Sequence, residues 1–173
     1  MEINTAHVSA MEKAAIWTNG ITSAYYDLAV NIPDIAHFQG RLLHLSTDDL
    51  EISSLFSKPI QYVCKDNSSK PSQDSFLLAL PISNSIEYIQ HNKRYEICSD
   101  GFLLQHGMMP YTFNSPSENQ MWVLKIDGNR LRQLCHKPED LCTKANAVGS
   151  HNTAFLKEYI PLAFQRLHAG NVD

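Results

Sequence analysis

The stretch from Phe38 to Leu131 constrains the fold most, because it consists of short apolar or alternating segments separated by turn residues. We predict about eight short strands in it. The clearest of these predicted strands span 38–46, 50–57, 61–65, 76–82, 85–91 and 120–126. Polar segments such as 66–72 and Ser99–Gly101 read as loops and turns between them. Short strands at this spacing, with few helices among them, favour a mainly β sandwich or a jelly-roll barrel that closes its own edges.

The strand patterns also predict which faces are buried. In 85–91, apolar and polar residues alternate, so that one face points into a core. The segment 76–82 is almost continuously apolar, which predicts a strand covered on both faces.

Helical patterns flank the strands on both sides. Residues 10–30 are partly helical, and Gly20 is expected to divide them into two pieces before Pro33 ends the pattern. After Asp127 the chain turns helical, and Asn152 or Thr153 can cap a final helix. We therefore divide the chain into an N-terminal arm or helical segment (1–35), a β-barrel (36–127) and C-terminal helices (128–173).

Charge and composition exclude several classes of protein. The 18 acidic and 14 basic residues give a net charge of -4, and the basic residues are scattered. Nucleic-acid binders concentrate positive charge on one face, so we expect no strong DNA binding by this chain alone. Residues 1–10 lack the features of a signal peptide, and no apolar run is long enough to span a membrane. The four cysteines have no CxxC spacing, which favours free thiols in the cytoplasm.

Several short sequence motifs are informative through their order and spacing, although none is specific by itself. They are Phe38-Gln39-Gly40-Arg41, the apolar segment 76–82 with its small-residue turn at 83–85, Asn92-Lys93-Arg94, Ser99-Asp100-Gly101, Pro110-Tyr111 and Leu124–Asp127. In this order, over about residues 20–150, the chain resembles the N-terminal effector-sensing domain of AraC/XylS-type transcription regulators. Two phrases depart from the family pattern. Ser99-Asp100-Gly101 stands where a P-G-D-like turn is expected, and Leu124–Asp127 lacks a proline.

The resemblance implies a cupin-like jelly-roll barrel followed by a helical dimerisation segment. It implies a homodimer that binds a small-molecule effector, needs no cofactor and is not an enzyme. Regulators of this type continue into helix-turn-helix motifs, and nothing after Leu167 resembles them. DNA, and RNA polymerase for the full-length regulator, would therefore be reached only through a C-terminal domain absent from this chain. We expect a part of a longer regulator or a stand-alone sensor.

Arg41 is the first candidate ligand residue, because it lies on a predicted strand among leucines. A buried arginine needs an anionic partner, and its guanidinium can clamp a carboxylate. Arg41 therefore favours an acid or another polar metabolite as the effector. The alternatives are an ion pair with a carboxylate such as Glu51, or simple exposure.

Other polar and aromatic residues on the predicted strands can line a ligand pocket. These candidates are His44, Tyr62, Tyr88, Gln90, His106 and Trp122. The alternative is that they are ordinary core residues. In the final helix, Leu156, Ile160, Phe164 and Leu167 form an apolar stripe that suits either dimerisation or packing on the chain's own barrel.

A small metal-dependent cupin enzyme is the main alternative function. Such enzymes hold their metal with an H-x-H pair, and no two of the eight histidines here are two residues apart. The chain also has no nucleophile elbow, P-loop or dinucleotide fingerprint. We therefore assign no catalytic residue and no metal ligand. A dimerisation module without any ligand is a third possibility, favoured by a barrel filled with side chains.

Overall fold

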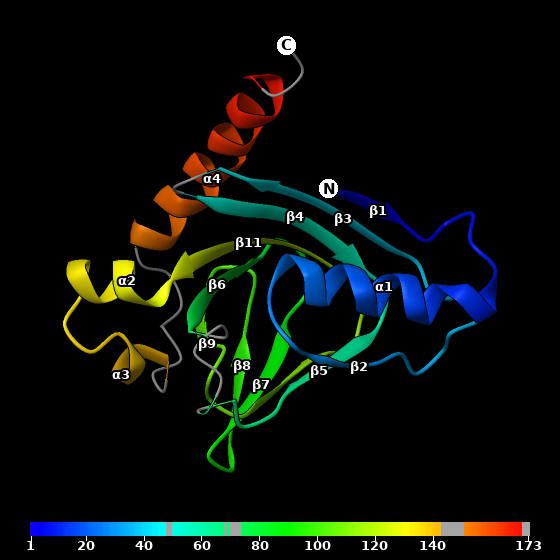
Figure 1. Cartoon of the computed structure of the whole chain (residues 1–173), viewed down its shortest axis with the longest axis horizontal. Coiled ribbons are helices and arrows are strands. Elements are labelled where there is room, and N and C mark those ends of the chain that lie inside the picture. The colour runs from blue at the N-terminus through cyan, green and yellow to red at the C-terminus, as the bar shows by residue number, and fades with distance from the viewer. Residues whose placement is uncertain (48–49, 68, 70–73, 143–150, 171–173) are drawn as a thin grey trace.

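Two antiparallel sheets face each other and form the body of the protein in the computed structural model (Figure 1). The structure describes residues 1–47, 50–67, 69, 74–142 and 151–170. The first sheet has the order β1 (Glu2–Asn4), β3 (Gly40–Ser46), β4 (Glu51–Ser57), β11 (Asn119–Asp127), β6 (Ser75–Pro81) and β9 (Leu103–His106). The second has the order β2 (Ala29–Asn31), β5 (Ile60–Cys64), β10 (Tyr111–Ser115), β7 (Ile86–Gln90) and β8 (Lys93–Ile97).

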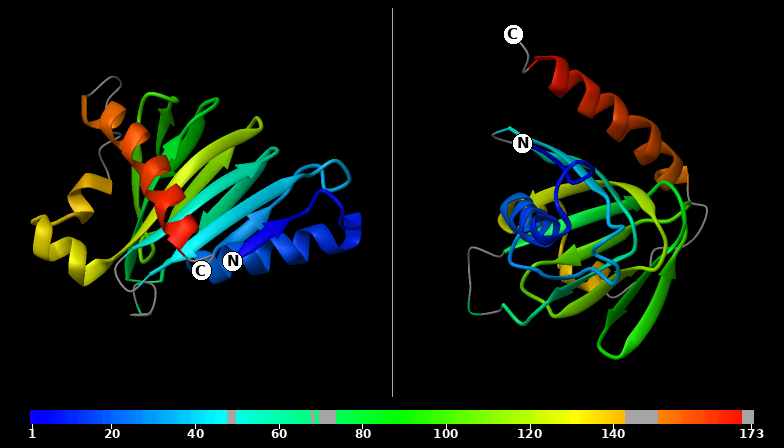
Figure 2. Two further views of the ribbon diagram at one scale, coloured as in Figure 1. Left: turned by 90° about the horizontal axis from the view of Figure 1, so that it is seen from above. Right: turned by 90° about the vertical axis from the view of Figure 1, so that its right-hand side faces the viewer.

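Four helices complete the described fold. They are α1 (Ala10–Ala24), α2 (Gly128–Leu134), α3 (Glu139–Cys142) and α4 (His151–Gly170). Helix α1 lies beside the barrel, and α4 crosses the outer side of the first sheet (Figure 2). The prediction of a mainly β protein with C-terminal helices is confirmed. Most of the predicted loop at 66–72, and residues 143–150 and 171–173, lie outside the described residues.

The main core lies between the two sheets. Strand β7 places Ile86, Tyr88 and Gln90 on its buried face, which confirms the predicted alternation. Strand β6 is covered on both faces, as its apolar sequence predicts. One face, with Leu77, belongs to the core between the sheets, while Leu80 belongs to a second apolar cluster.

The second cluster joins α4 to the outer face of the first sheet. Leu156, Ile160, Phe164 and Leu167, the four residues predicted as a dimerisation stripe, all pack in it. The ring centroids of Phe164 and Trp122 are 5.0 Å apart, and Ile52 of β4 is buried below them. These four side chains therefore hold α4 on its own barrel, which is the alternative that the sequence left open.

Two predictions about the N-terminal segment are wrong. Gly20 does not divide a helix, because α1 continues through it to Ala24. A Cβ atom on Gly20 would lie 1.9 Å from Cδ1 of Ile3, so the glycine allows β1 to pack closely against α1. The helical pattern predicted to run to residue 30 ends at Ala24 instead, residues 25–28 are irregular, and β2 follows, in which Val30 pairs with Tyr62 of β5. Ladder hydrogen bonds to a neighbouring strand thus outweigh the local helical pattern.

Gly40 provides a direct test of how α1 packs. A Cβ atom there would lie 2.6–2.9 Å from ring atoms of Trp17 in α1. Gly40→Ala is therefore expected to lower the free energy of unfolding by about 1–3 kcal/mol, the usual cost of overpacking. Gly170→Ala is the control, because nothing lies within 4 Å of that position. Urea denaturation of both variants measures the difference, and equal stabilities would contradict the packing of Trp17 on β3.

Candidate functional site

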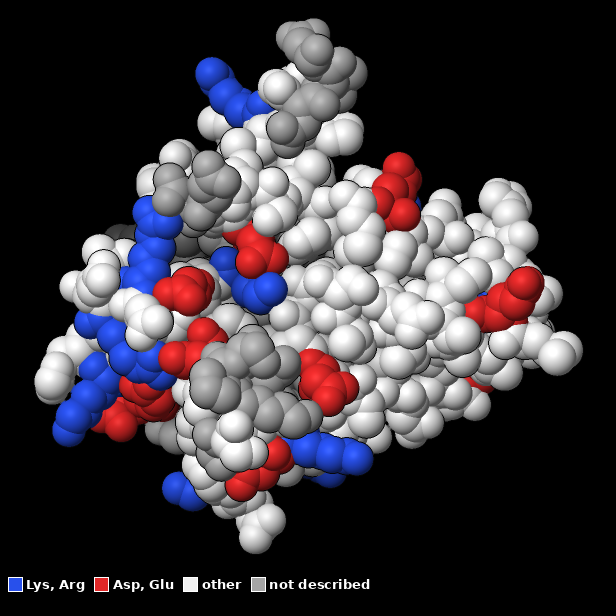
Figure 3. Space-filling model, in the orientation of Figure 1, with Lys and Arg blue, Asp and Glu red and all other residues white. Residues whose placement is uncertain are grey.

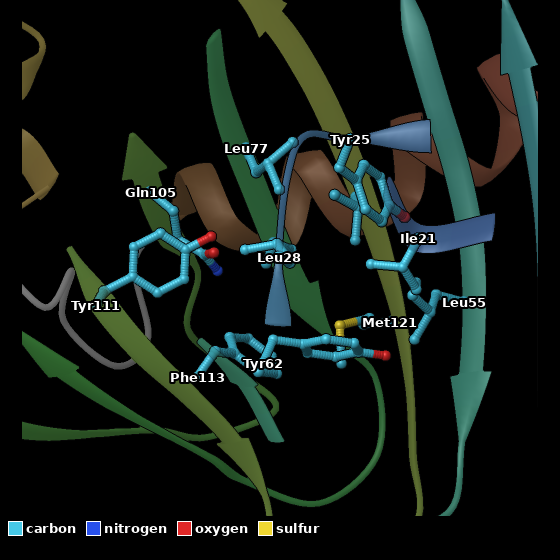
Figure 4. Close-up of a pocket in the computed structure, with 12 residues that line it drawn as sticks. Ile21, Tyr25, Leu28, Leu55, Tyr62, Leu77, Gln105, Tyr111, Phe113 and Met121 are labelled. Atoms are coloured by element: carbon cyan, nitrogen blue, oxygen red, sulfur yellow. The ribbon is translucent and has the colours of Figure 1, made fainter. Parts of the chain in front are cut away.

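A small cavity lies in the barrel interior (Figure 4). Its lining consists of Ile21, Tyr25, Leu28, Leu55, Tyr62, Leu77, Ala79, Gln105, Tyr111, Phe113, Met121 and Val123. These residues come from α1, from the connection between α1 and β2, and from strands of both sheets. The cavity offers about 30 Å³ to the centres of water molecules. One water needs about 10–15 Å³ by this measure, so the space suits a few waters rather than a metabolite.

The cavity lining carries no charged side chain, and its polar groups are three tyrosines and one glutamine. Burial raises the pKa of Tyr25, Tyr62 and Tyr111 well above the ordinary value for a phenol. Their hydroxyls therefore stay protonated at physiological pH and can donate hydrogen bonds. Figure 4 shows the hydroxyls of Tyr25 and Tyr62 at one end of the cavity, and Tyr111 close to Gln105 at the other.

The hydrogen bonds of these polar groups are only partly complete. The Tyr62 hydroxyl accepts a hydrogen bond of 3.1 Å from Nε1 of Trp17, and the Tyr111 hydroxyl is bonded to that of Tyr26. The Tyr25 hydroxyl is buried and has no partner of hydrogen-bond geometry among the described residues. The Ser53 hydroxyl lies beside it and slightly offsets the rise in its pKa, and Ser53 is also hydrogen-bonded to Nδ1 of His44 at 2.9 Å. A buried donor without a partner is costly, so the Tyr25 hydroxyl can gain from a ligand or a water.

Of the seven predicted ligand residues, Tyr62 lines this cavity, and three others lie near it inside the barrel. Tyr88 is fully buried with its ring centroid 5.3 Å from that of Tyr111. Nε2 of Gln90 donates to the carbonyl oxygen of Pro110 at 3.4 Å. His44 is buried on the inner face of β3, and its Nε2 lies 3.4 Å from Oε2 of Glu51.

Arg41, His106 and Trp122 point away from the cavity. The Arg41 side chain is 55% exposed, and its guanidinium lies 3.3 Å from a carboxylate oxygen of Glu2. The alternative of an exposed ion pair is therefore the one observed, with Glu2 rather than Glu51 as the partner. Trp122 packs below α4. The His106 ring stacks on Phe76 with centroids 4.3 Å apart, and its Nε2 lies 3.0 Å from Oδ1 of Asp74. The argument from Arg41 to an acidic effector thus loses its basis.

Sequence reasoning did not single out Tyr25, Gln105 or Tyr111 as ligand residues. Tyr25 follows the end of α1, in a segment predicted to be helical. Tyr111 and Phe113 alternate on β10, which was a usable signal because both then face the same side. Gln105 belongs to a strand of four residues, too short for its alternation to stand out.

A second polar cluster lies where the barrel meets α2 and α3. We call Asp74, His106, Arg132 and Glu139 the barrel–helix clamp. The Asp74 carboxylate accepts two hydrogen bonds from the Arg132 guanidinium, at 2.8 and 2.9 Å, and lies 3.0 Å from Nε2 of His106. Arg132 also donates from Nε to Glu139 at 2.8 Å. The clamp therefore ties β9 of the barrel to both helices, in a region where both signs of charge mix on the surface (Figure 3).

The barrel–helix clamp should make the free energy of unfolding depend on pH in the acidic range. The Arg132 guanidinium beside Asp74 lowers the pKa of that carboxyl in the folded protein. A carboxyl with a lowered folded pKa stabilises the fold above its unfolded pKa of about 3.9, and this contribution is lost as the pH falls through the folded pKa. Denaturant midpoints measured from about pH 5 down to about pH 2 should fall more steeply for the wild type than for Asp74→Asn. If the midpoints of the wild type and Asp74→Asn fell in parallel with pH, Arg132 would not be stabilising the Asp74 carboxylate in the folded protein.

Within the described part of the chain, no group of three His, Cys, Asp or Glu side chains is arranged to hold a metal ion. No described helix is long and apolar enough to cross a membrane.

Two facing antiparallel sheets with an internal cavity and appended helices define a cupin-like sandwich. A profile of the AraC-binding-like domain matches residues 17–169, and the chain therefore belongs to this family. The crystal structure of the AraC-like transcriptional activator CuxR is similar, with a TM-score of 0.77 and 17% sequence identity. That match covers 97% of this chain and 61% of the CuxR chain, so this chain spans less than two thirds of that protein.

Other solved structures match over a smaller part of the chain. A cupin superfamily protein from Desulfitobacterium hafniense DCB-2 has a TM-score of 0.41 and 9% identity, covering 53% of this chain and 78% of its own. The EutQ protein of Clostridium difficile also has a TM-score of 0.41 and 9% identity, covering 54% of this chain and 72% of its own. No curated protein matches the sequence.

Proposed function

We propose that this effector-binding domain takes a neutral, mainly apolar metabolite with hydrogen-bonding groups at two ends. The uncharged lining, with protonated hydroxyls at one end and the Tyr111–Gln105 pair at the other, carries this proposal. An anion buried here would lack a cation within the lining, and an unpaired buried charge is costly. A neutral phenol or indole derivative, or a hydroxylated aliphatic compound, has the chemistry that such a site recognises.

Binding of such a molecule requires the cavity to expand. A volume of about 30 Å³ is far below the 300–1,000 Å³ of ordinary ligand sites. Met121 has an unbranched side chain that can repack, and Leu28 lies in a segment without regular secondary structure. The effector would therefore favour an open arrangement of the barrel over the closed one, which is a population shift between two conformations.

Strand β9 offers a route from the cavity to the C-terminal helices. Gln105 lines the cavity, while the next residue, His106, belongs to the barrel–helix clamp on the other face. A shift of β9 on ligand binding would change the contacts of Asp74 with Arg132 and so the placement of α2 and α3. In a longer regulator in the cytoplasm, these helices would relay the signal to a C-terminal DNA-binding domain and through it to RNA polymerase.

We also propose that two copies associate through the outer side of α4. The predicted dimerisation stripe is occupied by the chain's own barrel, but the opposite side keeps three large apolar side chains in water. Phe155, Tyr159 and Leu162 are 62%, 56% and 49% exposed. Sedimentation velocity of the wild type and of Tyr159→Glu tests this, because a charge in an apolar interface should shift a dimer to monomers. A wild type that is monomeric at all concentrations would contradict the proposal.

Tyr25→Phe is expected to weaken binding of a hydroxylated neutral ligand about tenfold, because one net hydrogen bond is worth about 1–1.5 kcal/mol. The chain has two tryptophans, so Trp122→Phe leaves Trp17, which is hydrogen-bonded to Tyr62, as a fluorescent reporter of the cavity. Titration of this background with neutral phenols and indoles, with and without Tyr25→Phe, measures the change. Equal ligand affinities with and without Tyr25→Phe would show that the Tyr25 hydroxyl does not contact the ligand.

The small cavity volume favours one other function, a dimerisation module without a ligand. The buried hydroxyls of Tyr25 and Tyr88, which lack partners among the described residues, favour the sensor instead. Absence of any stabilising small molecule, together with a stable dimer, would support the module.

A further inference from the structure

A second pocket lies outside the barrel, beside the cavity. It has a volume of about 200 Å³ and is lined by Asp27, Leu28, Ala29, Val63, Lys65, Asp66 and Asn67. Most of these side chains are exposed or half-buried. Among the described residues, Leu28 alone lines both this outer pocket and the cavity. The two spaces therefore adjoin at this residue.

Leu28 ends a short irregular connection that is itself packed in the core, where Tyr25 and Tyr26 are also buried. Residues 25–28 have no regular secondary structure, and they connect α1 to β2, a strand of three residues at the edge of its sheet. Leu28 itself is 5% exposed, while its neighbours Asp27 and Ala29 are exposed. Leu28 packs in the main core between the sheets, so a rotamer change or a small shift of the connection would be needed to join the two spaces.

We infer that Leu28 is the gate between the outer pocket and the barrel, and that it limits which molecules enter. This inference rests on the proposed function, because it concerns entry to the proposed effector site. The two spaces also differ in chemistry. The outer pocket is lined by Asp27, Lys65 and Asp66, whereas the cavity lining is uncharged. A charged molecule loses its hydration when it moves from the outer pocket into the uncharged cavity, which costs free energy. A neutral molecule loses much less and can enter.

The gate is tested by the kinetics of probe binding. N-phenyl-1-naphthylamine is a neutral, apolar fluorophore, and stopped-flow mixing measures its association and dissociation rate constants. Leu28→Ala is expected to raise both by about tenfold, because a smaller side chain lowers the barrier to entry and exit alike. Leu28→Phe is expected to lower both. Leu43→Ala is the matched control, since Leu43 packs on the outer face of the first sheet below α4.

Variants that fill the cavity with a large side chain distinguish a failure of the gate from a failure of the proposed effector site. Ala79→Phe places a large ring in the lining and should abolish probe binding, and thermal unfolding checks that the variant is folded. Val123→Phe, at another lining position, serves the same purpose if Ala79→Phe does not fold. One outcome would overturn the gate but leave the effector site in place. In it, Ala79→Phe abolishes probe binding, while Leu28→Ala and Leu43→Ala bind the probe with the same rate constants. Binding that survives filling would overturn both.

Discussion

Trp17→Ala is expected to lower the free energy of unfolding by about 3–5 kcal/mol, the usual range for removing a large buried aromatic side chain. Trp17 is fully buried in the core between the sheets, and its ring meets that of Phe38 edge-on with centroids 5.6 Å apart. Its truncation would leave a cavity between α1 and β3. It would also remove the donor to the Tyr62 hydroxyl.

Trp17→Phe separates the two contributions. It keeps much of the apolar volume and loses the indole N–H, so its cost should be about 1–2 kcal/mol. Urea denaturation followed by circular dichroism measures both variants. A loss below about 1 kcal/mol for Trp17→Ala would mean that α1 is a detachable arm rather than a part of the barrel core.

Asp74→Ala is expected to cost about 2 kcal/mol and to loosen α2 and α3 from the barrel. The carboxylate accepts two hydrogen bonds from Arg132, and hydrogen bonds to charged groups contribute about 1.5–3 kcal/mol where they are shielded from water. Asp74 is 23% exposed and Arg132 is 34% exposed, so water compensates part of the loss.

An exposed ion pair provides the control for Asp74. Glu2 and Arg41 lie 3.3 Å apart, and their side chains are 57% and 55% exposed. Glu2→Ala should cost less than about 1 kcal/mol. Limited proteolysis should cut within α2 and α3 faster in Asp74→Ala than in Glu2→Ala. Equal cleavage and equal stability would show that the barrel–helix clamp does not hold these helices.

The strands were largely predictable, but the direction of their side chains was not. An alternating strand such as β7 reveals its inner face, because only one side of it is apolar. On β3, Leu42 faces the main core while Leu43 and Leu45 pack below α4, so both faces of the strand are apolar. The leucines next to Arg41 therefore do not reveal which face of β3 is the inner one, and Arg41 lies on the outer face.

Contacts between distant parts of the sequence were beyond prediction. Asp74 and Arg132 are 58 residues apart, and no local pattern connects a residue next to a polar loop with a helix after the last strand. The cavity residues near Tyr25 were missed for a related reason. The end of α1 is set by the pairing of β2 with β5, which is a tertiary contact.

Thermal shift of the purified chain with neutral phenols and indoles, each with EDTA, tests the central claim most directly. A neutral compound that binds the native barrel should raise the melting temperature, and about 2.7 kcal/mol is gained when its concentration is a hundred times Kd. The same compound should have no effect on Ala79→Phe, and carboxylic acids of the same size should stabilise less. The account would be contradicted if no neutral compound stabilised the wild type, or if only a divalent metal did so and EDTA abolished the effect.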